Sequence, residues 1–267
     1  MTKVIGQTKL MSIIDSYTIQ TLPKTLMFIG PDGCGKHTIA TYISEKFNLE
    51  RVEIDESISS ADIENFLYST VDTLYVIDLT KFSEKQQNQF LKIIEEPSKS
   101  VYFVLTTCSE AGVLNTVLNR CIKYTFDTYT KYEVEQIAGT AVNEKAFDIF
   151  KTPGKLLNMT DGSFNNIIDL AEKLVKNIHL ANYANTLSFS TKINYKDLYN
   201  KVDFNLFLDA VEYLAFEDFK NNSNQQSLTI FKITNQFKQY ATQSNINKET
   251  LMLNYLTTLW EAVHDFS

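Results

Sequence analysis

Short apolar runs alternate with polar, helix-compatible stretches through the first half of the chain. The runs are rich in β-branched and aromatic residues, and they occupy residues 25–30, 51–55, 73–78, 101–107 and 121–126. Strands that alternate with helices predict βαβ units and a parallel sheet, and the near-continuous apolar character of the runs indicates burial on both faces. Ser83 can cap the helix that follows it, which ends before Pro97. We therefore expect an α/β domain.

The pattern changes after about residue 127. From there on the apolar residues follow helical spacing, and no run is typical of a buried strand. Breaks rich in Gly, Pro, Asn and Ser occur at 152–154, 160–163 and 220–227. We predict three parts: an α/β domain at 1–126, a small helical lid at 127–162 and an all-helical domain at 163–267.

Composition indicates an ordinary cytoplasmic protein. The 267 residues are 44% apolar, enough to supply hydrophobic cores, and no apolar run is long enough to cross a bilayer. The N-terminal segment lacks the apolar stretch of a secretory signal. A net charge of −7 argues against broad electrostatic adhesion to nucleic acid. Three widely spaced cysteines predict neither a zinc module nor a disulfide framework.

The strand at 25–30 leads into a glycine-rich loop. Gly30, Gly33, Gly35 and Lys36 have the G-x-x-x-x-G-K spacing. In such a loop the glycines let backbone N–H groups turn toward phosphates, the following helix adds its positive end, and the lysine reaches the terminal phosphates. A plain strand-to-helix turn is the alternative. The spacing favours a phosphate-binding loop that could hold ATP or ADP.

Two neighbouring positions depart from the pattern of an efficient ATPase. His37 stands where a Ser or Thr hydroxyl usually binds Mg²⁺, and imidazole is a poor ligand for this oxygen-seeking ion. Thr38 would lie about 100° around the helix, so it is not an obvious substitute. Asp78 ends a strand where such ATPases hold Mg²⁺ through water, although it could instead be a capping carboxylate. Leu79 follows where a catalytic Glu is common. The pattern leaves Mg²⁺ in doubt and indicates nucleotide binding without efficient hydrolysis, or no nucleotide.

Several motifs resemble those of the clamp-loader branch of the AAA+ proteins, and most closely its delta-prime type. The resemblance is carried by "QQNQFLKIIEEP" (86–97), "VLTT" (104–107) and "TVLNRC" (116–121), with "VIGQTKL" (4–10) and "TPGKLLNM" (152–159) at its ends. It therefore covers about residues 1–160. The interval 47–74 contains no cysteine, so the four-cysteine zinc module found in bacterial members is absent and no zinc is predicted.

The resemblance implies roles for individual residues. Thr107 would read the γ-phosphate, and Lys155 would be the second sensor in the lid. Arg120 would project across a subunit interface as an arginine finger for a neighbour's nucleotide. The central helix would present a polar face formed by Gln87, Asn88 and Lys92. The alternatives are solvated or ion-paired side chains without these roles.

The implied protein is a subunit of a sliding-clamp loader in DNA replication, with a degenerate ATPase site and a collar-like helical C-terminal domain. Its partners would be the other loader subunits, the sliding clamp and, through the complex, primer–template DNA, but no membrane. Two alternatives stay open. The chain could be a catalytically active clamp-loader ATPase, or an AAA+ scaffold used as a binding module outside replication.

Overall fold

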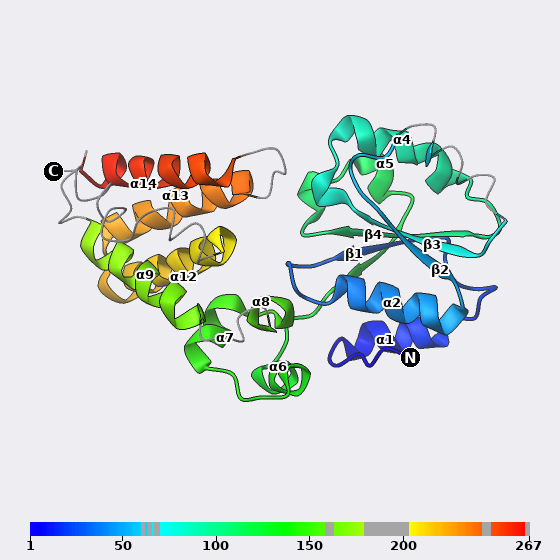
Figure 1. Ribbon diagram of the computed structural model, residues 1–267, viewed down its shortest axis with the longest axis horizontal. Coiled ribbons are helices and arrows are strands. Elements are labelled where there is room, and N and C mark those ends of the chain that lie inside the picture. Colours follow the sequence, from blue (N-terminus) through cyan, green and yellow to red (C-terminus); the bar gives the residue numbers. More distant parts are fainter. Residues whose placement is uncertain are drawn as a thin grey trace. The chain divides into compact units, whose positions relative to one another are not determined.

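The described residues form two compact units. The computed structural model describes residues 1–59, 62–63, 66, 70–157, 163–178, 203–241 and 247–264. The first unit comprises residues 1–142 and 152–154, and the second comprises 143–151 and 155–267. The first unit contains the sheet, while the described part of the second contains helices and their connections (Figure 1). The segment predicted as a lid is thus divided between the two units.

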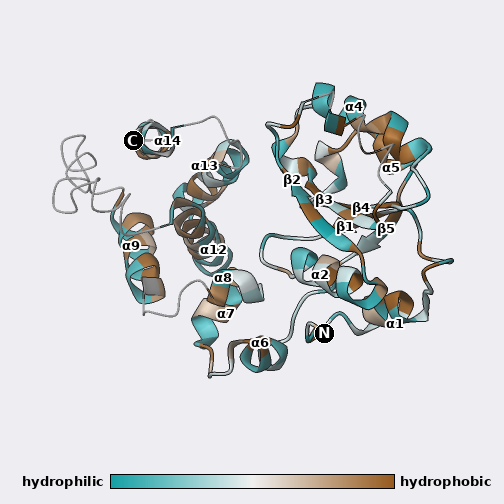
Figure 2. Ribbon diagram, turned by 45° about the vertical axis from the view of Figure 1, so that its right-hand side comes forward, coloured by the Kyte–Doolittle hydropathy of each residue, from teal (hydrophilic) through white to brown (hydrophobic). Residues whose placement is uncertain are grey.

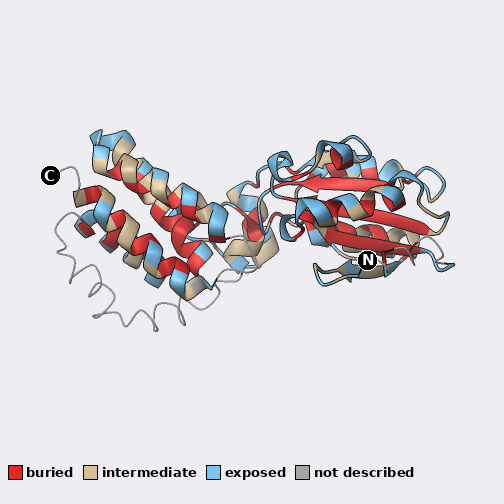
Figure 3. Ribbon diagram, turned by 90° about the horizontal axis from the view of Figure 1, so that it is seen from above, coloured by how far each residue is buried: buried red, intermediate tan, exposed pale blue. Residues whose placement is uncertain are grey.

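A five-stranded parallel sheet forms the centre of the first unit. Its order is β2-β3-β4-β1-β5, and all neighbouring strands run parallel. The strands are β1 (Thr25–Ile29), β2 (Glu50–Ile54), β3 (Thr73–Asp78), β4 (Val101–Thr107) and β5 (Ile122–Thr125). The three inner strands are almost wholly buried, and the two edge strands have exposed positions (Figure 3). The predicted parallel α/β fold is confirmed.

Helices cover both faces of this sheet, with α1 and α2 on one side and α4 and α5 on the other (Figure 1). The helices are α1 (Thr8–Ser16), α2 (Lys36–Phe47), η2 (Leu79–Lys81), α4 (Glu84–Glu95), η3 (Glu110–Gly112), α5 (Asn115–Leu118) and α6 (Lys131–Ala138). The predicted helix after Ser83 is α4. Its buried Phe90 and Ile94 belong to the core cluster on one face of the sheet. The Ser83 N–H donates to Oε1 of Gln86 at 3.0 Å, which closes the first turn.

The second unit has a separate hydrophobic core. Its helices are α7 (Glu144–Phe150), α9 (Ser163–Asn177), α12 (Phe204–Asn222), α13 (Gln225–Ala241) and α14 (Lys248–His264), and α8 (Pro153–Leu157) begins in the first unit and ends in the second. Apolar and polar positions alternate along these helices (Figure 2), as expected where one face packs inward. Tyr255 is fully buried, and its hydroxyl lies 2.8 Å from Oγ1 of Thr234. In the described parts of the chain, no helix is long and apolar enough to span a membrane.

Candidate functional site

The glycine-rich loop joins the end of β1 to the start of α2. Gly35 has φ = 90°, a left-handed conformation that glycine adopts without strain. A Cβ atom on Gly30 would lie 2.9 Å from both Sγ of Cys34 and Cβ of Phe126, so no side chain fits there. The Gly30 N–H donates to the Thr107 carbonyl at 3.1 Å, which ties the loop to the end of β4. The backbone therefore has the form that the spacing predicts.

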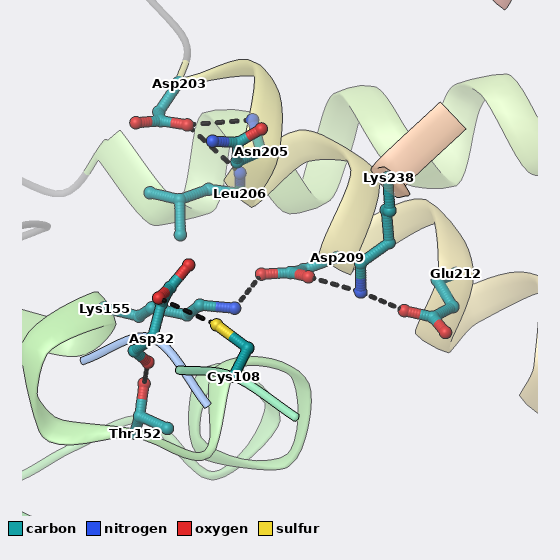
Figure 4. A network of polar contacts seen from close by, with 10 residues as sticks. All are labelled: Asp32, Cys108, Thr152, Lys155, Asp203, Asn205, Leu206, Asp209, Glu212 and Lys238. Atoms are coloured by element: carbon teal, nitrogen blue, oxygen red, sulfur yellow. Dashed lines mark hydrogen bonds and ion pairs between the residues drawn. The ribbon is translucent and has the colours of Figure 1, made fainter. Parts of the chain in front are cut away.

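A segment distant in sequence covers the outer side of this loop. Oγ1 of Thr152 donates to the carbonyl of Asp32 at 2.8 Å (Figure 4). The N–H of Gly154 donates to the carbonyl of Gly33, also at 2.8 Å. A Cβ atom on Gly154 would lie only 2.6 Å from Cα of Gly33, so this close approach requires glycine. The glycine of the predicted "TPG" break is thus explained by contact with the phosphate loop.

The N-terminal "GQ" box is held against the segment that follows β5. Gln7 donates through Nε2 to the carbonyl of Asp127 at 2.7 Å and accepts from the Asp127 N–H at 2.9 Å. From the same segment, the Tyr129 hydroxyl donates to the carbonyl of Cys34 at 2.9 Å. Burial raises the pKa of the Cys34 thiol, which keeps it protonated under the loop. These contacts place the N-terminal motif beside the phosphate loop.

Lys36 is turned onto its own loop. Its amine donates to the carbonyl of Gly30 at 2.6 Å and to that of Pro31 at 3.1 Å, and the residue is 7% exposed. A lysine reaches a bound phosphate through the same amine. Phosphate binding therefore requires Lys36 to exchange these carbonyl contacts for phosphate oxygens.

His37 is directed toward the edge strand β2. Its Nδ1 lies 3.2 Å from Oε1 of Glu53, which also accepts from Arg51. Both His37 and the neighbouring Thr38 are exposed. Position 37, where a Mg²⁺-binding hydroxyl is usual, therefore holds an imidazole that is paired with the Glu53 carboxylate.

Asp78 caps the turn that follows β3. Its Oδ1 accepts from the N–H of Thr80 at 3.2 Å and from the Thr80 hydroxyl at 2.8 Å. Leu79 is 2% exposed and belongs to the core cluster shared with α4. On the adjacent strand, Oγ1 of Thr107 donates to the carbonyl of Ser109 at 2.8 Å. The capping role that the sequence left open for Asp78 is present, and only one of its carboxylate oxygens is used in it.

These residues fit a phosphate group better than they fit a divalent cation. The amide groups at the start of α2 have no carbonyl partner within the helix, and Lys36 lies beside them. Mg²⁺ requires oxygen ligands, and position 37 offers an imidazole. Gly30, Gly33, Gly35 and Lys36 would hold the phosphates, while Asp78 would meet the cation through water.

Arg120 follows α5 and is bound by the end of α4. Its Nε donates to Oε1 of Glu95 at 2.5 Å, its Nη2 pairs with the same carboxylate, and its Nη1 donates to the Thr116 carbonyl at 2.6 Å. The side chain is 34% exposed. The guanidinium is therefore held at the surface of the first unit in a fixed orientation by the Glu95 carboxylate.

Gln87 is not on the polar face of α4 that the resemblance implies. It is 2% exposed, and its Nε2 donates to the carbonyls of Phe82 at 3.1 Å and Gly112 at 3.0 Å. Its Oε1 accepts from the N–H of Leu114 at 3.0 Å. The amide thus joins α4 to the loop before α5. Asn88 is exposed, as expected for a solvated face.

Replacing Gln87 with methionine should destabilise the protein by about 2 kcal/mol. The substitution keeps the length of the side chain but removes the partner of one buried backbone carbonyl and of two partly buried backbone groups. Each unpaired group carries a desolvation cost. Urea unfolding followed by circular dichroism measures the effect. Asn88→Ala is the matched control on the same helix, and its free energy of unfolding should stay within about 0.5 kcal/mol of the wild type. Equal losses in the two variants would contradict the bridging role.

Lys155 lies in an ion network of the second unit. Its amine is 2.5 Å from Oδ2 of Asp209, whose Oδ1 is 2.6 Å from Nζ of Lys238, and Lys238 also pairs with Glu212 (Figure 4). The Asp209 side chain is only 8% exposed. Burial acts to lower the pKa of Lys238, but the carboxylates of Asp209 and Glu212 outweigh it and raise that pKa. Lys155 is therefore neither an exposed helix lysine nor a free cation.

Two of these partners were missed by sequence reasoning. Glu95 is one of two glutamates before Pro97, and nothing in the spacing distinguishes it as the partner of Arg120. Asp209 stands among apolar residues of α12, and a carboxylate within an apolar helix face is itself a signal for a buried ion pair. That signal was available in the sequence.

The three cysteines differ in burial: Cys34 is buried, Cys108 is exposed and Cys121 is intermediate. All three cysteines are free thiols, and burial raises the pKa of Cys121 to about 12. Within the described ranges, no group of three His, Cys, Asp or Glu side chains is placed to hold a metal ion.

Comparisons with known proteins agree with this geometry. The model of the family described as DNA polymerase III, delta subunit, matches residues 62–130, which include Asp78, Thr107 and Arg120. No curated protein matches the chain in sequence. Among solved structures, a DNA polymerase III gamma subunit-related protein of Thermotoga maritima is similar with a TM-score of 0.53 and 15% identity, covering 96% of this chain and 99% of that one. The RuvB Holliday junction branch migration motor of the same organism has a TM-score of 0.50 and 14% identity, covering 82% and 77%.

At these identities the structural neighbours show the fold alone, and the family model matches residues 62–130, about a quarter of the chain. Both agree with the order of motifs along residues 1–160. Together they support a clamp-loader-like member of the DNA polymerase III-type AAA+ proteins.

Proposed function

We propose that this chain is a delta-prime-type subunit of a sliding-clamp loader that hydrolyses ATP weakly or not at all. Its partners are the other loader subunits, the sliding clamp and, through the complex, primer–template DNA. Its own contribution is a rigid interface and Arg120, which acts as an arginine finger on the nucleotide of a neighbouring subunit. Thr107 is a sensor residue of its own phosphate loop.

The observation that carries the proposal is a contrast within the nucleotide site, between the residues that would bind the phosphates and the residues that would bind Mg²⁺ and activate water. The phosphate loop keeps its glycines and Lys36, whereas Leu79 is buried in the core and His37 is paired with Glu53. A leucine cannot activate water, and an imidazole bound to a carboxylate cannot replace a Mg²⁺-binding hydroxyl. Phosphate binding is therefore separable from hydrolysis in this chain.

The contacts of Arg120 support its proposed role as an arginine finger. An arginine finger stabilises the charge of a transferring phosphoryl group and is supplied from outside the site that it serves. Glu95 and the Thr116 carbonyl orient the guanidinium before any partner arrives. The ion pair is partly exposed, so the arginine can exchange Glu95 for a neighbour's phosphate at little cost.

Reconstitution tests this function. The purified chain should co-elute with the remaining loader subunits and the sliding clamp in size-exclusion chromatography, with each component identified by mass spectrometry. Alone it should show background ATP turnover, and Lys36→Ala should not change that rate. Turnover by the isolated chain that is lost in Lys36→Ala would instead establish an active ATPase. Failure to associate with any loader subunit would leave the binding-module alternative.

A further inference from the structure

The phosphate loop carries an acidic side chain of its own. Asp32 is exposed and stands between Gly30 and Lys36, where the other loop residues are neutral. Its Oδ1 accepts from the thiol of Cys108 at 3.3 Å. A thiol is a neutral donor, so this contact leaves the negative charge of the carboxylate in place. The loop that would bind phosphates therefore also contains a group that repels them.

Two contacts hold the backbone around Asp32. Oγ1 of Thr152 donates to the Asp32 carbonyl at 2.8 Å. The N–H of Gly154 donates to the carbonyl of the next residue, Gly33, at 2.8 Å. With the backbone held on this side, the Asp32 side chain points toward Cys108 (Figure 4). The carboxylate is thus kept beside the loop at a defined position.

This position is at the carboxyl end of β4. Cys108 directly follows Thr107, the last residue of that strand, and Thr107 accepts from the Gly30 N–H at 3.1 Å. Ligands of parallel α/β sheets bind at the carboxyl ends of the strands, and the lysine of a phosphate loop reaches the terminal phosphates. The pKa of the Cys108 thiol is raised to about 12, first by burial and then by the charge of Asp32, while the charge of Lys36 acts to lower it. Asp32 and Lys36 therefore act on the same place, where the terminal phosphate of a bound nucleotide would lie.

The third phosphate of a triphosphate would meet this carboxylate. Relative to a diphosphate it adds negative charge at the outer end of the ligand, and two like charges at a partly exposed site repel by an amount comparable to about a tenfold change in affinity. The neighbouring Thr107 hydroxyl donates to the Ser109 carbonyl at 2.8 Å, so in this arrangement it does not offset the repulsion. The inner phosphates would lie on the amide groups at the start of α2. A diphosphate therefore suits this loop better than a triphosphate.

We propose that Asp32 makes the loop selective for a nucleoside diphosphate over a nucleoside triphosphate. The inference rests on the nucleotide binding included in the proposed function, and it names the class of nucleotide that the loop takes. Asp32 repels the third phosphate and takes no part in bond cleavage, so it determines specificity. A loop that retains a diphosphate stays in one state while neighbouring subunits turn over ATP, which suits a subunit that contributes a rigid interface.

Asp32→Asn tests the assignment because asparagine keeps the size of the side chain and an acceptor for Cys108 while it removes the charge. The affinities for ADP and for ATP are measured by isothermal titration calorimetry in EDTA, so that no divalent cation masks the phosphate charge. The wild type should bind ADP at least about tenfold more tightly than ATP. In Asp32→Asn this preference should fall to about twofold or less, mainly through tighter binding of ATP.

Glu45→Gln is the matched control for net charge. Glu45 is exposed on the same helix, nine positions after Lys36 and about 13 Å farther along its axis. That separation exceeds the screening length of about 10 Å at about 0.1 M salt, so this variant should keep the wild-type preference. Lys36→Ala should bind ADP at least about tenfold more weakly, which identifies the loop as the site.

Two results would overturn the assignment and leave the proposed function intact. One is equal affinity of the wild type for the two nucleotides, and the other is an unchanged preference in Asp32→Asn. ADP binding that persists in Lys36→Ala would place the nucleotide outside the loop and would also overturn it. If the wild type bound neither nucleotide, both this inference and nucleotide binding would be wrong, whereas assembly with the loader subunits is decided separately by the reconstitution.

Discussion

Arg120→Ala should lower the ATP turnover of a reconstituted clamp loader by about a hundredfold or more. An arginine finger is worth several orders of magnitude in the rate of phosphoryl transfer, and its loss leaves the transition-state charge unneutralised. The effect requires the neighbouring subunit's nucleotide, so the isolated chain should show no change. Steady-state phosphate release by the complex, with assembly confirmed by size-exclusion chromatography, measures the result.

Glu95 provides the control for this experiment. In the isolated chain the arginine must leave Glu95 before it can reach a partner, and a partly exposed ion pair of this kind contributes only about 0 to 1 kcal/mol. Glu95→Gln should therefore leave the turnover of the complex at or above the wild-type rate. Arg120→Lys should stay impaired because an ammonium lacks the planar fork of the guanidinium. Unchanged turnover in a fully assembled Arg120→Ala complex would refute the finger role.

Asp209→Asn should lower the free energy of unfolding by about 3 kcal/mol. The carboxylate lies between the amines of Lys155 and Lys238, and removal of one partner from a buried ionic network leaves uncompensated charge. The asparagine amide keeps the size of the side chain, so the loss reports on charge and not on packing. Chemical unfolding of the whole chain followed by circular dichroism measures the loss.

An exposed ion pair of the same helix is the control. Glu217 pairs with Lys220 at 3.7 Å, and the lysine side chain is 63% exposed. Glu217→Gln should change stability by no more than about 0.5 kcal/mol. Combining Asp209→Asn with Lys155→Met should recover part of the loss, because the second change removes one of the unpaired charges. If both single carboxylate variants lost the same stability, the buried network would not have the predicted importance.

The strands and the central helix could be predicted because local patterns determine them. Five apolar runs became the five strands within about one residue at either end. For the three inner strands this follows because a strand buried on both faces must be apolar along its length. The glycine spacing likewise predicted the loop between β1 and α2. Position 35 has a left-handed backbone conformation that few residues other than glycine adopt without strain.

The partners of the polar side chains could not be predicted in the same way. Gln87 occupies a sequence position typical of a solvated helix face, yet it is buried because the loop at 112–114 packs over it. Arg120 lies in a segment that resembles a family motif, but its pairing with Glu95 depends on how α5 packs against α4. Contacts of this kind join residues more than twenty positions apart, and no local periodicity reports them.

The amino-acid sequence alone thus determined the order of strands and helices, the phosphate loop, and the two replaced positions His37 and Leu79. These are properties of residue type and spacing, which act over a few neighbouring residues. Only the tertiary structure decided that Lys36 lies on its own loop carbonyls, that Lys155 pairs with a buried carboxylate, and that the Asp32 carboxylate meets the Cys108 thiol. Hydrogen bonds and ion pairs form between groups that folding brings together, so their presence or absence exists only once the chain has packed.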